Sequence, residues 1–181
     1  VAIFALVLWT AMGLGTHRSA VRLDTLRPGQ RLLSGVLVAA IFVQIALGGL
    51  VAGLKAGRAY NTWPLMDGGI VPDAMWALSP WYLNPFENMA TAQFDQRMMA
   101  YLVAVLASWH TLAVVRTADD ERIVRSALWL AAAVLAQVAL GIWTLLAAVP
   151  LSLGLAHQAL AMLVLAAALR NRHNIIRPAI S

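Results

Sequence analysis

One histidine of this sequence stands inside a long apolar run. His157 lies within residues 151–169, a stretch without Asp, Glu, Lys or Arg. An ionisable side chain in such a run is costly to bury and is usually functional. Its imidazole could be an axial ligand of a haem iron held between helices. It could also form hydrogen bonds with a neighbouring helix backbone or with Gln158, so both interpretations stay open.

A weak internal repeat indicates where a partner of His157 would stand. Residues 96–103 resemble residues 157–164, which places Gln96 at the position that His157 holds in its own segment. Both residues lie near the start of their apolar segments, so they should sit at similar depth, as two ligands of one haem would. Glutamine is not among the usual protein ligands of haem iron, and this is a defect of the haem interpretation.

A stronger repeat relates the other two long apolar segments. Residues 42–48 (FVQIALG) resemble residues 135–141 (LAQVALG), which aligns Gln44 with Gln137 and Gly48 with Gly141. With Gly49 and Gly53, the glycine at 48 forms a row of small residues. Such residues allow close approach to another helix or to a flat macrocycle.

Charged residues near the start of the 96–103 segment suggest a second kind of contact. Arg97 stands apart from the other basic clusters, either as an anchor at the membrane interface or as a partner of a haem propionate, which a guanidinium binds through two hydrogen bonds. Lys55 and Arg58 could act in the same way from the other end of the preceding loop. Asp95 and Glu87 are candidate charge partners for these bases.

The remaining candidate ligands have simpler interpretations. His110 lies about 21 Å along a helix from Gln96, so we expect an interfacial role for it near the cytoplasmic end. His17 and His173 lie in the basic segments outside the apolar runs, and we expect both to be solvated. Met99 lies one turn after Gln96, where core filling is the favoured role and iron ligation the alternative.

The composition specifies the solvent in which these residues work. The 181 residues are 61% hydrophobic and 12% charged, with a mean hydropathy of +0.76. A soluble domain carries about 25% charged residues, so a soluble globular enzyme is excluded. The absence of cysteine excludes disulfides and thiolate chemistry. The net charge of +5 is dispersed in short clusters, so no nucleic acid partner is expected.

Four apolar segments are long enough to span a bilayer as helices, which require about 20 residues each. They cover residues 32–54, 98–115, 126–149 and 151–169. The predicted fold is an all-α membrane protein, a four-helix bundle over residues 32–169. We expect residues 1–15 to be the end of a preceding transmembrane helix.

The distribution of arginine predicts the orientation. The basic segments, each with three or more arginines, are residues 16–31, the connection around Arg122 and the tail 170–181. All three fall on one side if every segment crosses once. We therefore expect them in the cytoplasm, the protein in the inner (cytoplasmic) membrane, and the loop 55–95 on the outer side.

The predicted outer loop is unusually long and rich in Pro and Trp. Loops of about 40 residues are uncommon without a function or a structure of their own. Residues 73–78 and 87–94 could each form a short interfacial helix. The loop is either an aromatic-anchored segment resting on the membrane or a lid over a ligand at the outer end of the bundle.

Four motifs resemble the haem A synthase family, most closely its alphaproteobacterial and mitochondrial branch. They are residues 48–68 (GGLVAGLKAGRAYNTWPLMDG), 85–88 (PFEN), 93–97 (QFDQR) and 155–158 (LAHQ). The stretch YNTWPLMDG is highly specific, whereas the His-Gln pair alone would be weak. The resemblance covers nearly the whole chain.

The resemblance implies one half of an eight-helix fold made of two similar four-helix halves. Members oxidise a methyl group of haem O to the formyl group of haem A, the cofactor of terminal oxidases. This chain would be the C-terminal half, which holds haem b between two histidines, whereas the N-terminal half receives haem O. His157 falls on the second histidine. The first falls on Gln96, since the family's His-Arg pair reads Gln96-Arg97 here.

This departure leaves the iron ligation open. The outcomes are a five-coordinate haem on His157, a substitute ligand such as Met99 or water, or no stable haem. We expect the chain to be the cofactor half of the enzyme, with Arg97 and Arg58 holding propionates, and to be inactive alone. The expected partners are the bilayer, haem and an N-terminal half of the same protein. A second copy of the chain stays open as a further partner.

Two other functions fit the helix pattern. A b-type membrane cytochrome would only carry electrons, and a cofactor-free interaction protein would have lost the haem site at Gln96. The YNTWP motif favours the synthase over both.

Overall fold

The computed structural model describes residues 1–14, 28–66 and 68–176. The α-helices are α1 (Ala2–Leu14), α2 (Pro28–Gly53), α3 (Asn84–Glu87), α4 (Met89–Thr117), α5 (Glu121–Leu146) and α6 (Leu151–Ile176). Short 3-10 helices cover Ala56–Arg58, Asp73–Trp76 and Trp81–Leu83. The described ranges contain no β-strand. Four helices (α2, α4, α5 and α6) are long and apolar enough to cross a membrane, which confirms the predicted all-α membrane bundle.

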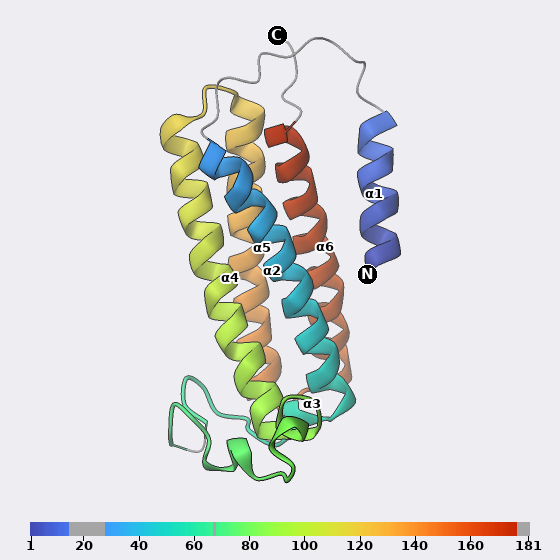
Figure 1. Cartoon of the computed structure of the whole chain (residues 1–181), viewed down its shortest axis with the longest axis vertical. Helices are drawn as coiled ribbons and strands as arrows, with labels where there is room; N and C mark the ends of the chain where they lie inside the picture. Colours follow the sequence, from blue (N-terminus) through green and yellow to red (C-terminus); the bar gives the residue numbers. More distant parts are fainter. Residues whose placement is uncertain (15–27, 67, 177–181) are drawn as a thin grey trace.

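The four long helices form a closed ring in the order α2, α4, α5, α6 (Figure 1). Their inward faces share one core, whose fully buried side chains include Leu37, Ile41, Leu130 and Leu165. Large apolar side chains also cover the outside, where lipid replaces water as the solvent. The shorter α1 packs along α6, outside the ring.

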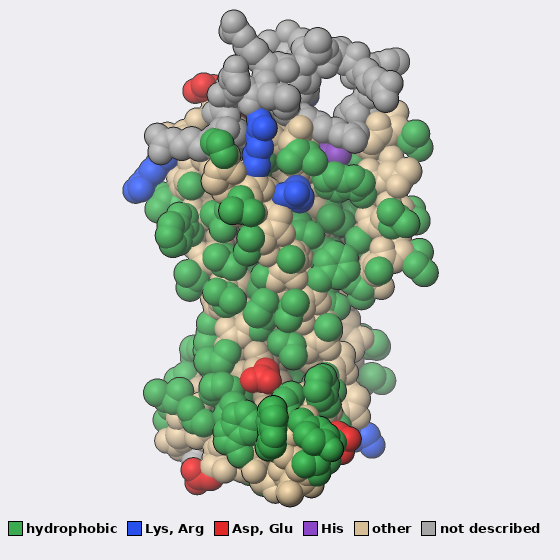
Figure 2. Space-filling view, in the orientation of Figure 1, with side chains coloured by type: hydrophobic (Ala, Val, Ile, Leu, Met, Phe, Trp, Pro, Cys, Tyr) green, Lys and Arg blue, Asp and Glu red, His purple; other side chains and the backbone are tan. Residues whose placement is uncertain are grey.

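The two ends of the bundle differ in charge and in structure. The segment 54–88 folds against the end where α2 finishes and α4 begins, at the bottom of Figure 1. Most of the Lys and Arg side chains visible in Figure 2 lie at the opposite end. This asymmetry agrees with the arginine pattern on which the predicted orientation depends.

The helices are longer than the apolar segments from which they were predicted. Helix α4 begins at Met89, nine residues before the predicted start at Met98, and α6 continues through residues 170–176 of the predicted tail. The added turns carry polar side chains such as Gln93 and Asn171, which a hydropathy window rejects. They remain helical because these side chains find hydrogen bonds inside the bundle.

The predictions for the outer loop were half right. The 3-10 helix Asp73–Trp76 lies inside the predicted element 73–78. The predicted helix 87–94 was wrong as a separate element, because α3 ends at Glu87 and the following residues start α4. Asn88, in an extended conformation, separates the two helices and caps α4.

Two buried asparagines hold this loop together. The Asn88 side-chain oxygen accepts hydrogen bonds from the backbone N–H of Ala90 (2.8 Å) and Thr91 (3.4 Å). Its amide donates to the Ala74 carbonyl (2.7 Å) and to Asn84 Oδ1 (2.9 Å). One side chain therefore both caps α4 and fixes the 3-10 helix of residues 73–76 against it.

We expect Asn88→Ala to lower the free energy of unfolding by about 1–2 kcal/mol, through loss of the cap and of the buried donors. Denaturant unfolding in detergent micelles measures this change. Asn88→Ser is the matched control, because its hydroxyl oxygen can still cap α4 and it should lose only part of the stability. Equal unfolding midpoints for Asn88→Ala and the unaltered chain would contradict this role.

The structure corrects two histidine predictions. His110 is fully buried rather than interfacial, and its Nε2 lies 2.7 Å from Asn171 Oδ1. The Asn171 amide in turn donates to Ser126 Oγ (2.9 Å), so one network joins α4, α5 and α6. His173 is buried rather than solvated, with its ring edge-on to Trp9 at 5.6 Å. The prediction for His17 lies outside the described residues.

Arg172, one of the arginines of the predicted tail, also has a structural role. Counting arginines per segment, as in the prediction of orientation, does not show it. Arg172 Nη1 donates to the Arg31 carbonyl (3.0 Å) and to Ser34 Oγ (3.2 Å), which joins α6 to α2. A Cβ at Gly35 would lie 2.6 Å from that nitrogen. A side chain at position 35 would therefore require the end of the Arg172 side chain to shift.

Candidate functional site

The two positions that the weak repeat aligned lie at the same end of the bundle. Gln96 is the eighth residue of α4 and His157 the seventh of α6. Each therefore lies about 10 Å along its helix at 1.5 Å per residue. Both helices start at the end covered by the loop (Figure 1). Both residues thus lie about two turns into helices that start at the same end of the bundle, as the repeat predicted.

Each of these side chains faces a glycine of the stronger repeat. A Cβ built on Gly48 of α2 would lie 3.2 Å from Gln96 Nε2, and one built on Gly141 of α5 would lie 2.8 Å from His157 Cε1. The pairs α2–α4 and α5–α6 therefore repeat one arrangement, a glycine opposite a nitrogen-bearing side chain. By contrast, Gly49 has no atom within 4 Å of a built Cβ.

The α5–α6 pair also contains the second repeated residue, Gln137. Its amide nitrogen donates to the His157 carbonyl (3.0 Å) and lies 3.4 Å from His157 Nε2. His157 Nδ1 and Gln137 Oε1 are buried without a hydrogen-bond partner among the described residues, and so is Oε1 of Gln44, the equivalent residue of α2. Buried polar atoms normally have partners, so these three atoms are exceptions within the described residues.

A third group of polar side chains ties the loop to α4. The carbonyl of Tyr60 accepts from Gln93 Nε2 (2.9 Å) and from Arg97 Nη2 (3.1 Å). Arg97 Nη1 also lies 3.4 Å from the Leu65 carbonyl. Its Nε is buried and unpartnered within the described part of the chain. Arg97 thus fixes the loop while one of its donors stays available.

The loop is held from the other side by α5. Asn61 donates to the carbonyls of Gly57 (2.8 Å) and Leu145 (3.1 Å), and Trp63 Nε1 donates to Tyr101 Oη (3.1 Å). The residues 60–65 therefore bridge the ends of α4 and α5. These contacts fix residues 60–65 at this end of the bundle, and both the lid and the aromatic-anchored segment remain predictions.

The structure does not bring every predicted residue into this group. Arg58 is exposed at the end of its 3-10 helix and, like Lys55, forms no hydrogen bond or ion pair through its side chain with the described residues. Asp95 and Glu87 are not ion-pair partners of Arg97 there, so that pairing prediction was wrong. Met99 packs against the apolar core, as the favoured interpretation predicted.

Sequence reasoning missed three members of the group. Gln93 and Asn61 lie in motifs that the resemblance singled out, but neither was assigned a contact. Tyr60 contributes only its backbone carbonyl, which no side-chain pattern can indicate. The two amides could have been suspected because polar side chains at the ends of apolar spans need partners.

The arrangement suits a haem in one respect and departs from it in another. His157 offers an imidazole nitrogen with an orphaned ring atom, and Arg97 offers an orphaned donor for a carboxylate. Gln96 offers only an amide where a second imidazole would stand. Within the described residues, no group of three or more His, Asp or Glu could hold a bare metal ion. The residues therefore fit a haem bound by one histidine.

We expect Gly141→Ala to disturb this site, because the new Cβ must displace the imidazole or the helix. Forced shifts of this kind cost about 1–3 kcal/mol. Gly49→Ala is the matched control, because it adds the same methyl group in open space and should not destabilise the helix. Unfolding midpoints in detergent measure both. Equal midpoints for the two variants would show that His157 does not lie against α5.

These features define the class of protein, a multi-pass α-helical membrane protein. In its bundle, two helix pairs repeat one arrangement, a glycine opposite a nitrogen-bearing side chain. The model of the cytochrome oxidase assembly protein family, COX15-CtaA, matches residues 1–169, and the chain belongs to this family.

Curated relatives named heme A synthase agree with this assignment. The chain is 48% identical over 166 residues to that of Bradyrhizobium sp. (strain ORS 278), covering 90% of this chain and 44% of the relative. It is 43% identical over 175 residues to that of Parvibaculum lavamentivorans, covering 97% of this chain and 48% of the relative. The chain thus spans about half the length of these relatives. No solved structure matches it.

Proposed function

We propose that this chain forms the haem b-binding half of a haem A synthase. The enzyme would oxidise the methyl group of haem O to the formyl group of haem A for terminal oxidase assembly. Family membership and the names of the relatives support the biosynthetic role. The remaining length of those relatives leaves room for a second half, which we propose as the place where haem O binds.

The observation that carries the proposal is the repeated glycine pairing. Gly48 faces Gln96 and Gly141 faces His157, and both side chains lie about two turns from the start of their helices. Glycine lets a flat macrocycle or a ring side chain approach the helix backbone closely. A planar group held inside a helix bundle needs contacts from more than one helix pair, and the pairs α2–α4 and α5–α6 each offer one such site.

Each residue then has a distinct role. His157 would bind the iron, Arg97 would pair with a propionate through its free donor, and Arg58 would turn inward for the other propionate. The bound haem would supply an iron that accepts and releases electrons. Gln96 occupies the position of the second ligand, and its amide could hydrogen-bond a water there. The loop residues 60–65 exclude bulk water from this end.

We further propose that the protein lies in the inner (cytoplasmic) membrane. The arginine-rich end, with residues 16–31 and 170–181, would face the cytoplasm, and loop 55–95 the outer side. The bilayer, haem and an N-terminal half would be its partners. A homo-oligomer is a further partner that size measurements in detergent would reveal.

The test is haem A production by a protein that contains this chain. It is expressed in a bacterium that lacks its own haem A synthase but makes haem O, and the extracted haems are separated and quantified. Haem A above the background of the empty strain supports the proposal. Bound haem b without haem A would instead support a b-type cytochrome. Neither haem b nor haem A in a folded protein would support a cofactor-free interaction protein.

A further inference from the structure

A hollow in the surface lies at the other end of the bundle, far from the loop. The hollow, of about 500 Å³, opens between α5 and α6. Its wall consists of four residues of α5 and three of α6: Arg122, Arg125, Ser126 and Trp129, with Ala167, Arg170 and Asn174. The spacings of three and four residues place each set on one face of its helix. The hollow is therefore a groove between two helices and not a chance gap in a loop.

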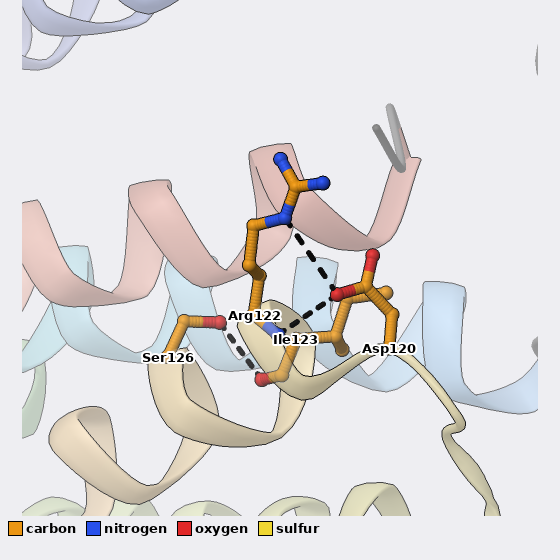
Figure 3. Close-up of polar contacts among 4 residues, drawn as sticks. All are labelled: Asp120, Arg122, Ile123 and Ser126. Carbon is orange, nitrogen blue, oxygen red and sulfur yellow. Dashed lines mark hydrogen bonds and ion pairs between the residues drawn. The ribbon is translucent and has the colours of Figure 1, made fainter. Parts of the chain in front are cut away.

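Three arginines surround this hollow, and no carboxylate of the described residues belongs to its wall. Arg122 Nε lies 4.0 Å from Asp120 Oδ1, a weak ion pair in which the arginine side chain is 57% exposed. Figure 3 shows the two terminal nitrogens of Arg122 pointing away from Asp120. Arg125 and Arg170 form no hydrogen bond or ion pair with any described residue. Among the residues that the structure describes, the positive charge of Arg125 and Arg170 therefore has no partner.

One polar side chain of the hollow, Ser126, is already hydrogen-bonded. Ser126 is buried, donates to the Ile123 carbonyl (2.9 Å; Figure 3) and accepts from Asn171. The three arginines and Asn174 are therefore the polar groups of the described wall that are available to a ligand. A guanidinium binds phosphate oxygens through paired hydrogen bonds, so a phosphate group is the matching ligand chemistry.

The depth of the hollow indicates where that phosphate comes from. Trp129 lies seven residues after Arg122, about 10 Å deeper into the apolar span, and is 69% exposed. Tryptophan at this depth is typical of the membrane interface, with arginine above it at headgroup level. Across the groove the small Ala167 leaves space, and Leu163 one turn deeper is 63% exposed to lipid. From the end of the bundle toward its middle, the surface is thus first cationic, then aromatic and then apolar. A phospholipid presents its phosphate, glycerol region and acyl chains in the same order.

We propose that this hollow binds the phosphate headgroup of an anionic phospholipid, with the glycerol region beside Trp129 and Ala167 and an acyl chain along the α5–α6 groove. Basic pockets between transmembrane helices are known to select such lipids. The zwitterionic headgroup of phosphatidylcholine would be disfavoured, since its choline cation meets the same arginines. The inference is independent of the proposed haem function.

The test measures lipid binding to the protein purified in a neutral detergent. Phosphatidylglycerol is titrated in and retained lipid is counted by native mass spectrometry, with phosphatidylcholine and inorganic phosphate as comparison probes. We expect saturable binding of phosphatidylglycerol. Arg125→Gln and Arg170→Gln should each weaken it about 5-fold, from about 1 kcal/mol for an arginine near the headgroups. Arg116→Gln is the matched control, an exposed arginine at the same end but outside the hollow, and should not change binding.

Three results would overturn the proposal. They are equal binding of phosphatidylcholine, competition by inorganic phosphate at the concentration of the lipid, and an equal loss in Arg116→Gln. If an arginine variant fails to fold, a second measurement on the unaltered chain and on Trp129→Phe still tests the site. Phosphatidylglycerol with brominated acyl chains, added near equimolar amounts, should quench a fluorescence component that Trp129→Phe lacks. Identical quenching of both proteins would contradict the site.

Discussion

Replacing Gln96 with histidine is expected to turn this chain into a tight haem b protein. The new imidazole would stand opposite Gly48, as His157 stands opposite Gly141, and would supply the second axial nitrogen. We expect haem affinity to rise at least about tenfold, equivalent to about 1.4 kcal/mol. Optical spectra of the purified protein, oxidised and reduced, should show sharp low-spin bands only in the variant.

The control for this variant is Gln93→His, one turn earlier on α4. Gln93 binds the Tyr60 carbonyl and is not the aligned position, so an imidazole there should not give low-spin bands. Low-spin bands already present in the unaltered chain would mean that another side chain, such as Met99, supplies the sixth ligand. If the Gln96→His protein folds but retains no more haem, the assignment of position 96 is wrong.

Removing His157 is expected to have the opposite effect. His157→Ala leaves no imidazole on α6 at this depth, so the haem should lose its protein ligand and dissociate on purification. We expect a loss of affinity of at least about tenfold, and added imidazole should restore binding because it fills the space left beside Gly141. Absorbance per protein, with and without imidazole, measures both effects.

His110→Gln is the matched control for this loss. His110 is also a buried histidine of the bundle, but it binds Asn171 at the far end. Its replacement should lower stability without changing the spectrum of bound haem. An unchanged spectrum in His157→Ala would contradict the proposed ligand, whereas loss of haem without imidazole rescue would indicate a structural role only.

The pattern of apolar residues was sufficient for the four spans, because each run is long enough to cross a bilayer. It did not give the correct helix ends. The first turns of α4 and the last of α6 carry Gln93, Asn171 and Arg172, and such side chains count against a span. Gln93 and Asn171 are buried and Arg172 half-buried, because partners in the loop or on other helices form hydrogen bonds with them. A hydropathy window covers only neighbouring residues, so it cannot indicate hydrogen-bond partners that are distant in the chain.

The same distinction explains the histidines. His110 stands near the end of an apolar run, where a partly solvated role is the usual expectation. Its burial depends on Asn171, which lies 61 residues further along the chain. In contrast, the equivalence of Gln96 and His157 could be predicted from the sequence, because aligning the repeated segments places the two residues at the same position.

The sequence by itself determined the apolar solvent, the number of spans, the asymmetry of charge and the equivalence of positions 96 and 157 within a repeat. These depend on composition, on run lengths and on internal similarity, all of which are local or periodic. Only the tertiary structure decided that Arg97 and Gln93 hold the Tyr60 carbonyl, and that arginines of α5 and α6 surround one hollow. Such groups form where helices pack, so their members are chosen by distance in space and not by distance along the chain.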